Sequence, residues 1–72
     1  MYNYTISIIE DNNKIERLNY TDEKAAAEVY NTMCIVASYH INDICGIQLW
    51  QHRKGKTIDN DPRARIIKQY YK

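Results

Sequence analysis

The chain has 72 residues, of which 44% are hydrophobic and 26% are charged, and its 10 Lys and Arg against 9 Asp and Glu leave a net charge of +1. This length predicts a single domain over residues 1–72, because it leaves no room for a second core, and the near-neutral charge excludes a disordered acidic or basic tail. No run reaches the roughly 18 apolar residues of a transmembrane helix, and the start of the chain lacks the features of a signal peptide, so we expect a cytoplasmic protein with no membrane partner.

The charges are distributed unevenly along the chain. Residues 1–50 hold seven acids and three bases, a net charge of −4, whereas residues 51–72 hold two acids and seven bases, a net charge of +5. This uneven distribution of charge indicates a partner that binds through electrostatic attraction.

The composition also indicates the origin of the gene. The residues 11 Ile, 7 Asn, 7 Tyr and 6 Lys make up 31 of the 72 residues. These residues use AT-rich codons, which favours a gene from an AT-rich bacterium, plasmid or phage.

Two strands joined by a turn are predicted at the start of the chain. From Tyr2 to Ile9 the residues alternate between two faces, and a period of two with aromatic and β-branched side chains is typical of a β-strand. Residues 11–13 are Asp-Asn-Asn, which favours a hairpin turn because these side chains bond their own backbone and tolerate a positive φ. Residues 15–20 then return as a second strand.

A long helix is predicted next. Thr21 followed by Asp22 and Glu23 favours a helix start, because a hydroxyl can cap a free N–H and two carboxylates meet the positive end of the helix dipole. The helical pattern extends to about His40. Residues at helical spacing form a stripe that we expect to lie on the sheet: Ala26, Val29, Tyr30, Met33, Val36 and Ala37.

The second half of this helix is apolar on more than one side. Residues 33–37 are five consecutive apolar residues, and Ile35 and Tyr39 cannot face the sheet if the stripe does. A C-terminal segment or another copy of the protein must then cover them. We predict a homodimer whose self-association interface includes Ile35, Tyr39 and Thr32.

A third strand is predicted over residues 44–51, with Cys45, Ile47 and Leu49 pointing inward and Trp50 on the opposite face. The residues that follow, Arg53 to Lys56, indicate a turn that leads into a short fourth strand around Thr57 and Ile58.

Residues 63–71 fit two structures. Asp61 as N-cap and Pro62 as first helical residue predict a short C-terminal helix, supported by Ile67 and Tyr71 four positions apart. The same residues could also alternate along a strand. With the helix as first choice, the predicted fold is α+β: a small, mainly antiparallel four-stranded sheet in the order ββαββ, with one long helix packed on one face and a short C-terminal helix.

No pattern in the sequence predicts catalysis, a metal site or a cofactor. Cys34, His40, Cys45 and His52 are zinc-ligand types, but they lack the close pairs of structural zinc sites, and thiols in a helix or strand usually act as small hydrophobes. No nucleophile beside a base and no phosphate-binding motif stands out. We therefore expect a protein that is not an enzyme.

The basic C-terminal third is the strongest candidate for a binding surface. Cations beside aromatic rings suit contact with phosphates and stacking on bases. The residues predicted to bind a partner or an anion are Trp50, His52, Arg53, Lys54, Lys56, Arg63, Arg65 and Tyr70.

Taken together, these patterns favour a small non-catalytic binding protein, homodimeric and encoded by a phage or mobile element. We expect it to bind and inhibit a host macromolecule, such as a nucleic-acid enzyme or an antiviral defence component, with a host protein as the first choice of partner. One alternative is a nucleic-acid-binding protein that uses the basic C-terminal third. Another is a sponge for an anionic nucleotide, in which Arg53, Arg63 or Arg65 from two subunits would meet across the dimer.

Overall fold

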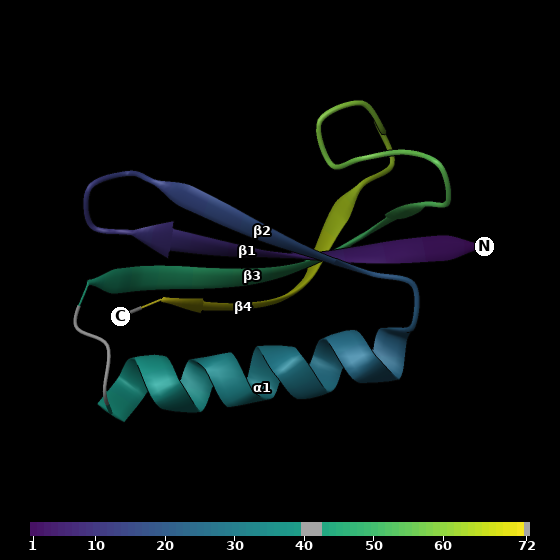
Figure 1. The fold of residues 1–72 in the computed structure, drawn as a ribbon. Helices are drawn as coiled ribbons and strands as arrows, with labels where there is room; N and C mark the ends of the chain where they lie inside the picture. The colour runs from purple at the N-terminus through teal and green to yellow at the C-terminus, as the bar shows by residue number, and fades with distance from the viewer. Residues whose placement is uncertain (40–42, 72) are drawn as a thin grey trace.

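The computed structural model describes residues 1–39 and 43–71. Its elements are, in chain order, β1 (Tyr2–Glu10), β2 (Ile15–Tyr20), α1 (Glu23–Tyr39), β3 (Ile44–Arg53) and β4 (Arg65–Tyr71). The strands form an antiparallel sheet in the order β2-β1-β3-β4, and α1 lies along one face of it (Figure 1). The predicted α+β class and the order ββαββ are confirmed.

The core lies between α1 and the two central strands. Ile6 of β1 pairs with Leu18 of β2 on one side and with Leu49 of β3 on the other. Because side chains alternate along a strand, these three residues share the face toward α1, where Ile6 and Leu49 are completely buried. The helix adds the buried Ala26, Tyr30 and Ala37 and the half-buried Val29 and Met33. Most of the predicted stripe of α1 therefore packs on the sheet.

The cap of α1 differs from the predicted one. Asp22 caps the helix in place of Thr21, because its Oδ2 accepts a hydrogen bond from the backbone N–H of Ala25 at 2.9 Å. A carboxylate at this position also interacts favourably with the helix dipole. At the other end, the predicted terminus at His40 lies outside the described residues.

The predicted C-terminal helix is wrong, because residues 65–71 form β4. This strand pairs with β3, with Ile47 opposite Tyr70. The free edge of β3 offers backbone hydrogen bonds to the segment, and its Ile and Tyr residues fit a pleated, half-buried surface. The register shifts between Leu49 and Trp50, where β4 carries one extra residue.

The predicted fourth strand around Thr57 and Ile58 is also wrong, because residues 54–64 form a loop. The Thr57 N–H donates to Asn60 Oδ1 at 2.7 Å, and the Asp61 N–H donates to the Thr57 carbonyl at 3.1 Å. Such local hydrogen bonds satisfy the backbone without a partner strand. The loop lies on the side of the sheet opposite α1 (Figure 1).

No helix in the described parts of the chain combines the length and the apolar character needed to cross a lipid bilayer.

Candidate binding site

One buried carboxylate joins the two ends of the 54–64 loop. Asp61 Oδ2 accepts the backbone N–H of Arg53 at 2.7 Å, and Asp61 Oδ1 accepts the backbone N–H of Arg63 at 3.0 Å. The Arg53 guanidinium also donates to Oδ1, from Nε at 3.0 Å and from Nη2 at 2.9 Å. The guanidinium and the two backbone donors hold the pKa of Asp61 well below its ordinary value. The contacts of Asp61 therefore hold together the two ends of the loop, at Arg53 and at Arg63.

A second contact ties the tip of the loop to the sheet. Arg17 of β2 donates from Nη1 to Asp59 Oδ2 at 2.6 Å and from Nη2 to Asp59 Oδ1 at 3.3 Å. These hydrogen bonds from the guanidinium lower the pKa of Asp59. Because the two residues are 42 positions apart, the contact fixes the loop over the distant strand β2.

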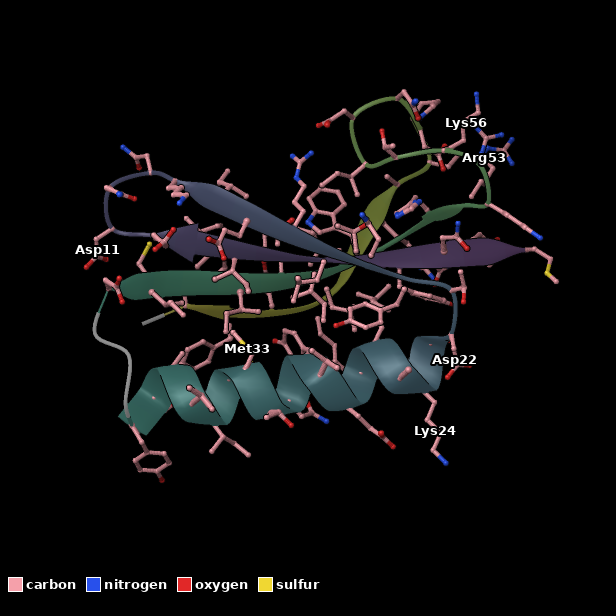
Figure 2. The ribbon with its side chains drawn as sticks, in the orientation of Figure 1. Asp11, Asp22, Lys24, Met33, Arg53 and Lys56 are labelled. Atoms are coloured by element: carbon pink, nitrogen blue, oxygen red, sulfur yellow. The ribbon has the colours of Figure 1, made fainter. Side chains whose placement is uncertain are left out.

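The basic residues predicted to bind a partner divide into a paired one and several unpaired ones. Arg53 is engaged by Asp61. Four of them are exposed and have no acidic partner among the described residues: Lys54, Lys56, Arg63 and Arg65. Arg53 and Lys56 lie at one end of the molecule and Asp11 of the β1–β2 turn lies at the other (Figure 2). Asp22 at the start of α1 also lies toward the end that carries Arg53 and Lys56, so the charge polarity of the sequence is not a simple separation of charges in the structure (Figure 2).

The two aromatic residues predicted to join these cations lie elsewhere. Trp50 is half-buried on the face of the sheet opposite α1, and its Nε1 donates to Gln48 Oε1 at 3.0 Å. Tyr70 lies on the face toward α1, where its hydroxyl is 2.9 Å from Ser38 Oγ. The structure therefore does not assemble the eight predicted residues into a single site.

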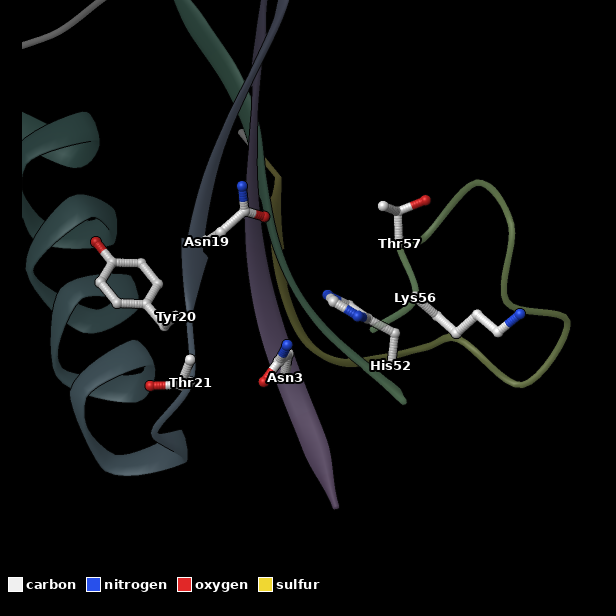
Figure 3. A pocket seen from close by; sticks show the side chains of 7 residues that line it. All are labelled: Asn3, Asn19, Tyr20, Thr21, His52, Lys56 and Thr57. Atoms are coloured by element: carbon white, nitrogen blue, oxygen red, sulfur yellow. The ribbon is translucent and has the colours of Figure 1, made fainter. Parts of the chain in front are cut away.

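A hollow of about 220 Å³ lies between the loop and the sheet (Figure 3). Its lining comes from β1, β2, the β2–α1 connection, β3 and the loop: Asn3, Asn19, Tyr20, Thr21, His52, Lys56 and Thr57. His52 lies between the two asparagines on one side and Lys56 and Thr57 on the other (Figure 3). Two of the predicted binding residues, His52 and Lys56, thus both line this hollow, although the Lys56 side chain extends away from His52 (Figure 3).

A hydrogen-bonded chain orients the imidazole of His52. The Thr5 hydroxyl donates to Asn19 Oδ1 at 2.9 Å and lies 2.7 Å from His52 Nε2. A hydroxyl carries one hydrogen, which Thr5 gives to Asn19, so Nε2 is the donor in the contact with Thr5. The other ring nitrogen, Nδ1, is buried and has no hydrogen-bond partner among the described residues.

The residues predicted to form a dimer interface lie on the outer side of α1. Ile35 is 60% exposed, Tyr39 is 77% exposed and Thr32 is exposed. Thr32 also lines a shallow hollow of about 300 Å³ with Glu28, Val29 and Met33. The described part of the chain does not cover this side of the helix, so the predicted pairing stays a prediction.

Several residues of this hollow were not predicted to have a role. Asn3 of β1 pairs with His52 of β3. The alternation of β1 places Asn3 and Thr5 on its polar face, so this part of the hollow could be predicted from the sequence. That Thr57 lines the hollow could not be predicted from the sequence, because its position depends on how the loop returns over the sheet.

The residues considered for zinc do not form a site in the described chain. Cys34 and Cys45 are free thiols, and His40 lies outside the described residues. Residues 1–39 and 43–71 contain no group of three or more His, Cys, Asp or Glu side chains that could hold a metal ion.

Comparison with known proteins gives no relative for this fold or site. No family model, no curated protein and no solved structure matches the chain.

Proposed function

We propose that this chain is a small non-catalytic binding protein that docks its basic loop onto an acidic surface of a partner protein. The observation that supports the proposal is that the acidic side chains of the loop form ion pairs, whereas most of its basic side chains do not. Its two carboxylates, Asp59 and Asp61, are engaged by arginines, whereas Lys54, Lys56 and Arg63 are exposed and unpaired within the described structure. The loop therefore presents cations from a backbone that its internal contacts hold in place.

Preorganisation and charge explain how such a loop could bind tightly. A segment that is already ordered loses less conformational entropy on association, so more of the contact energy remains as affinity. Clustered cations also accelerate encounter with an anionic surface and favour the correct orientation. A protein of this kind would inhibit its partner by occupying the surface that the partner needs.

Pairing of two copies through the outer side of α1 belongs to the same proposal. Ile35 and Tyr39 lie one helical turn apart and expose large side chains, which supports an interface there. The loop and α1 lie on opposite sides of the sheet, so a dimer formed through α1 would keep both loops free. Two loops on one dimer would strengthen binding to a partner that offers two sites.

A charge-reversal experiment tests the docking surface. Wild-type protein, a Lys54→Glu/Arg63→Glu variant and a Lys24→Glu control on the exposed start of α1 would be used as baits in a bacterial lysate. We expect the same acidic protein to be retained by the wild type and by the control, and to be lost from the double variant. Equal retention by all three baits would show that the loop does not form the interface.

A nucleic-acid partner is the main rival, because the same cations could contact phosphates. Filter binding of labelled DNA and RNA over a salt series separates the two. Affinity that falls steeply with rising salt and is lost in the double variant would favour nucleic acid. Absence of binding at low salt would eliminate it.

A further inference from the structure

The free edge of the sheet at β4 carries cations and no acidic residue. β4 is the last strand in the order β2-β1-β3-β4, and no other segment of the described chain hydrogen-bonds to its outer side. Every second N–H and C=O of such an edge strand points away from the sheet and can pair with a further strand. We propose that β4 binds an extended acidic segment of the partner protein as a fifth strand. This inference rests on the proposed function, because it names a second contact of the same acidic partner.

A bulge in β4 brings its two cations onto one face. Arg65 and Lys68 are three positions apart, so in a regular strand their side chains would point to opposite faces. Ile67 is the extra residue of the bulge, so that Lys68 pairs with Leu49. Arg65 pairs with Gln51, two positions further along β3. Since Leu49 lies on the face toward α1 and the faces alternate, both cations lie on that face of the sheet, at its edge.

These two cations are open to a partner. Arg65 and Lys68 are exposed, and neither has a carboxylate partner in the described parts of the chain. A strand paired with β4 would place every second side chain beside them, because side chains on one face of neighbouring strands lie next to each other. Opposite charges in such positions stabilise the pairing. The segment that fits therefore carries Asp or Glu at alternate positions.

The same charges disfavour a second copy of this chain at the edge. Two β4 strands related by a two-fold axis would pair antiparallel, with both helices on the same side of the joined sheet. The cations of the two copies would then share one face, where like charges oppose pairing. Lysine and a bulge on an edge strand are devices that prevent two sheets from joining through their edges. They leave this edge open to a strand of opposite charge.

The other face of β4 selects the remaining side chains of the segment. Ile66 and Tyr71 pair with residues of β3 that point away from α1. Ile66 is half-buried and Tyr71 is 52% exposed, so both offer apolar surface to an incoming strand. β-branched and aromatic side chains pack well across neighbouring strands. The segment therefore alternates acidic residues on the face toward α1 with apolar residues on the opposite face.

The edge is continuous with the docking surface of the loop. The loop leads directly into the start of β4, so the exposed Arg63 lies two positions before Arg65 (Figure 1). A partner held by the loop could therefore reach β4 without crossing the sheet. Two contacts with one partner strengthen each other when the geometry allows both at once.

Peptides of matched length test the added strand. A peptide that alternates Glu with Val over the length of β4, and one that alternates Lys with Val, would be titrated into the full chain up to about 1 mM and followed by NMR. We expect the acidic peptide alone to bind and to slow the solvent exchange of alternate amide hydrogens of β4. Absence of binding, or slowed exchange at β2 in place of β4, would overturn the proposal. So would tighter binding of a single-stranded oligonucleotide at this edge.

Two methylated forms of the acidic peptide distinguish strand pairing from attraction of charges. In an extended strand, the N–H groups of the Glu residues point to one side and those of the Val residues to the other. One form carries N-methyl groups on Glu and the other on Val, so one of them blocks the hydrogen bonds to β4. We expect this form to lose at least about tenfold in affinity, while the other binds like the parent peptide. Equal affinities of the two forms would overturn the proposal.

Charge reversal on the protein locates the contact. Lys68→Glu should weaken binding of the acidic peptide at least about fivefold, because a carboxylate would lie beside those of the peptide. Lys14→Glu makes the same change next to β2, at the other edge of the sheet, and its affinity should stay within about twofold. Arg65→Glu replaces Lys68→Glu if that variant proves unstable. Equal losses at the two edges would mean non-specific attraction and would refute the contact.

The peptide titration and the lysate experiment fail independently. Retention of an acidic protein through the loop, without binding of the acidic peptide, would refute the added strand alone. Binding of the peptide at β4, together with equal retention by all three baits, would refute docking of the loop alone.

Discussion

The ring of Tyr71 lies so close to the backbone of Gly46 that no side chain fits between them. A Cβ on residue 46 would be 2.7 Å from Tyr71 Cδ1 and 2.8 Å from Cε1. The two residues are register partners on β3 and β4, and the Tyr71 hydroxyl accepts a hydrogen bond from Gln48 Nε2 at 2.6 Å. An aromatic ring over a glycine in this way fixes the register of an edge strand.

We expect Gly46→Ala to destabilise the fold by about 1–2 kcal/mol, because the new methyl group forces the Tyr71 ring out of its place. In a Tyr71→Ala background the same substitution should cost almost nothing, since the obstacle is gone. Urea unfolding of the four proteins of this double-mutant cycle measures the difference. An equal cost in both backgrounds would contradict the contact.

The local sequence of residues 65–71 does not determine their secondary structure. Ile67 and Tyr71 lie four positions apart, as in a helix, yet the same segment alternates as a strand does, so local spacing left two structures open. The outcome depends on β3, whose free edge pairs with the segment and whose Gly46 leaves room for Tyr71. Both features depend on the tertiary structure. For β1, in contrast, the alternation of the residues alone was sufficient to predict a strand.

The candidate site shows the same division. His52 and Lys56 were recognisable by residue type, and the polar face of β1 by its alternation. The ion pair between the loop and β2 was not recognisable, because Arg17 and Asp59 are 42 positions apart and each also fits an ordinary surface role. Asp61 does accept the backbone N–H of Arg63, as an N-cap would, but no helix follows it, and the same carboxylate also binds Arg53, eight positions earlier.

Replacing Asp61 by asparagine should loosen the loop and change the acid stability of the protein. The pKa of Asp61 is lowered in the folded state, so its charge stabilises the fold above the unfolded pKa near 4, and this contribution is lost as pH falls from there toward the lower folded pKa. We expect Asp61→Asn to lower Tm at neutral pH by roughly 5 °C. Its Tm should also fall less steeply than that of the wild type below about pH 4. Melting curves over a pH series measure both effects. Parallel curves for the two proteins would show that the Asp61 charge is not coupled to folding.

Tyr30 should make the fold sensitive to alkali. Burial against the sheet, together with a hydrogen bond to Cys34, raises its pKa from 10.0 to about 12. The folded state therefore favours the neutral phenol, and this contribution is complete below pH 10 and is lost as pH rises from 10.0 toward about 12. We expect Tyr30→Phe to remove one late phenolate step from the ultraviolet titration and to flatten the alkaline loss of stability. Tyr39→Phe, at an exposed position of the same helix, is the matched control. If both variants lose the same step, Tyr30 is not the group that titrates late.

Substitutions at Ile35 and Met33 distinguish a dimer interface from the core of the subunit. Ile35 is 60% exposed, so Ile35→Asp should change the stability of the single subunit by no more than about 0.5 kcal/mol while placing two carboxylates in the interface of the proposed dimer. Met33 packs half-buried against the core, where a carboxylate should cost about 2–4 kcal/mol and unfold the subunit. Native mass spectrometry at high micromolar concentration should therefore show a wild-type dimer, a folded 8.6 kDa monomer for Ile35→Asp and an unfolded chain for Met33→Asp. A wild-type monomer under these conditions would refute the pairing, and unfolding by both substitutions would mean that Ile35 supports the fold of the subunit itself.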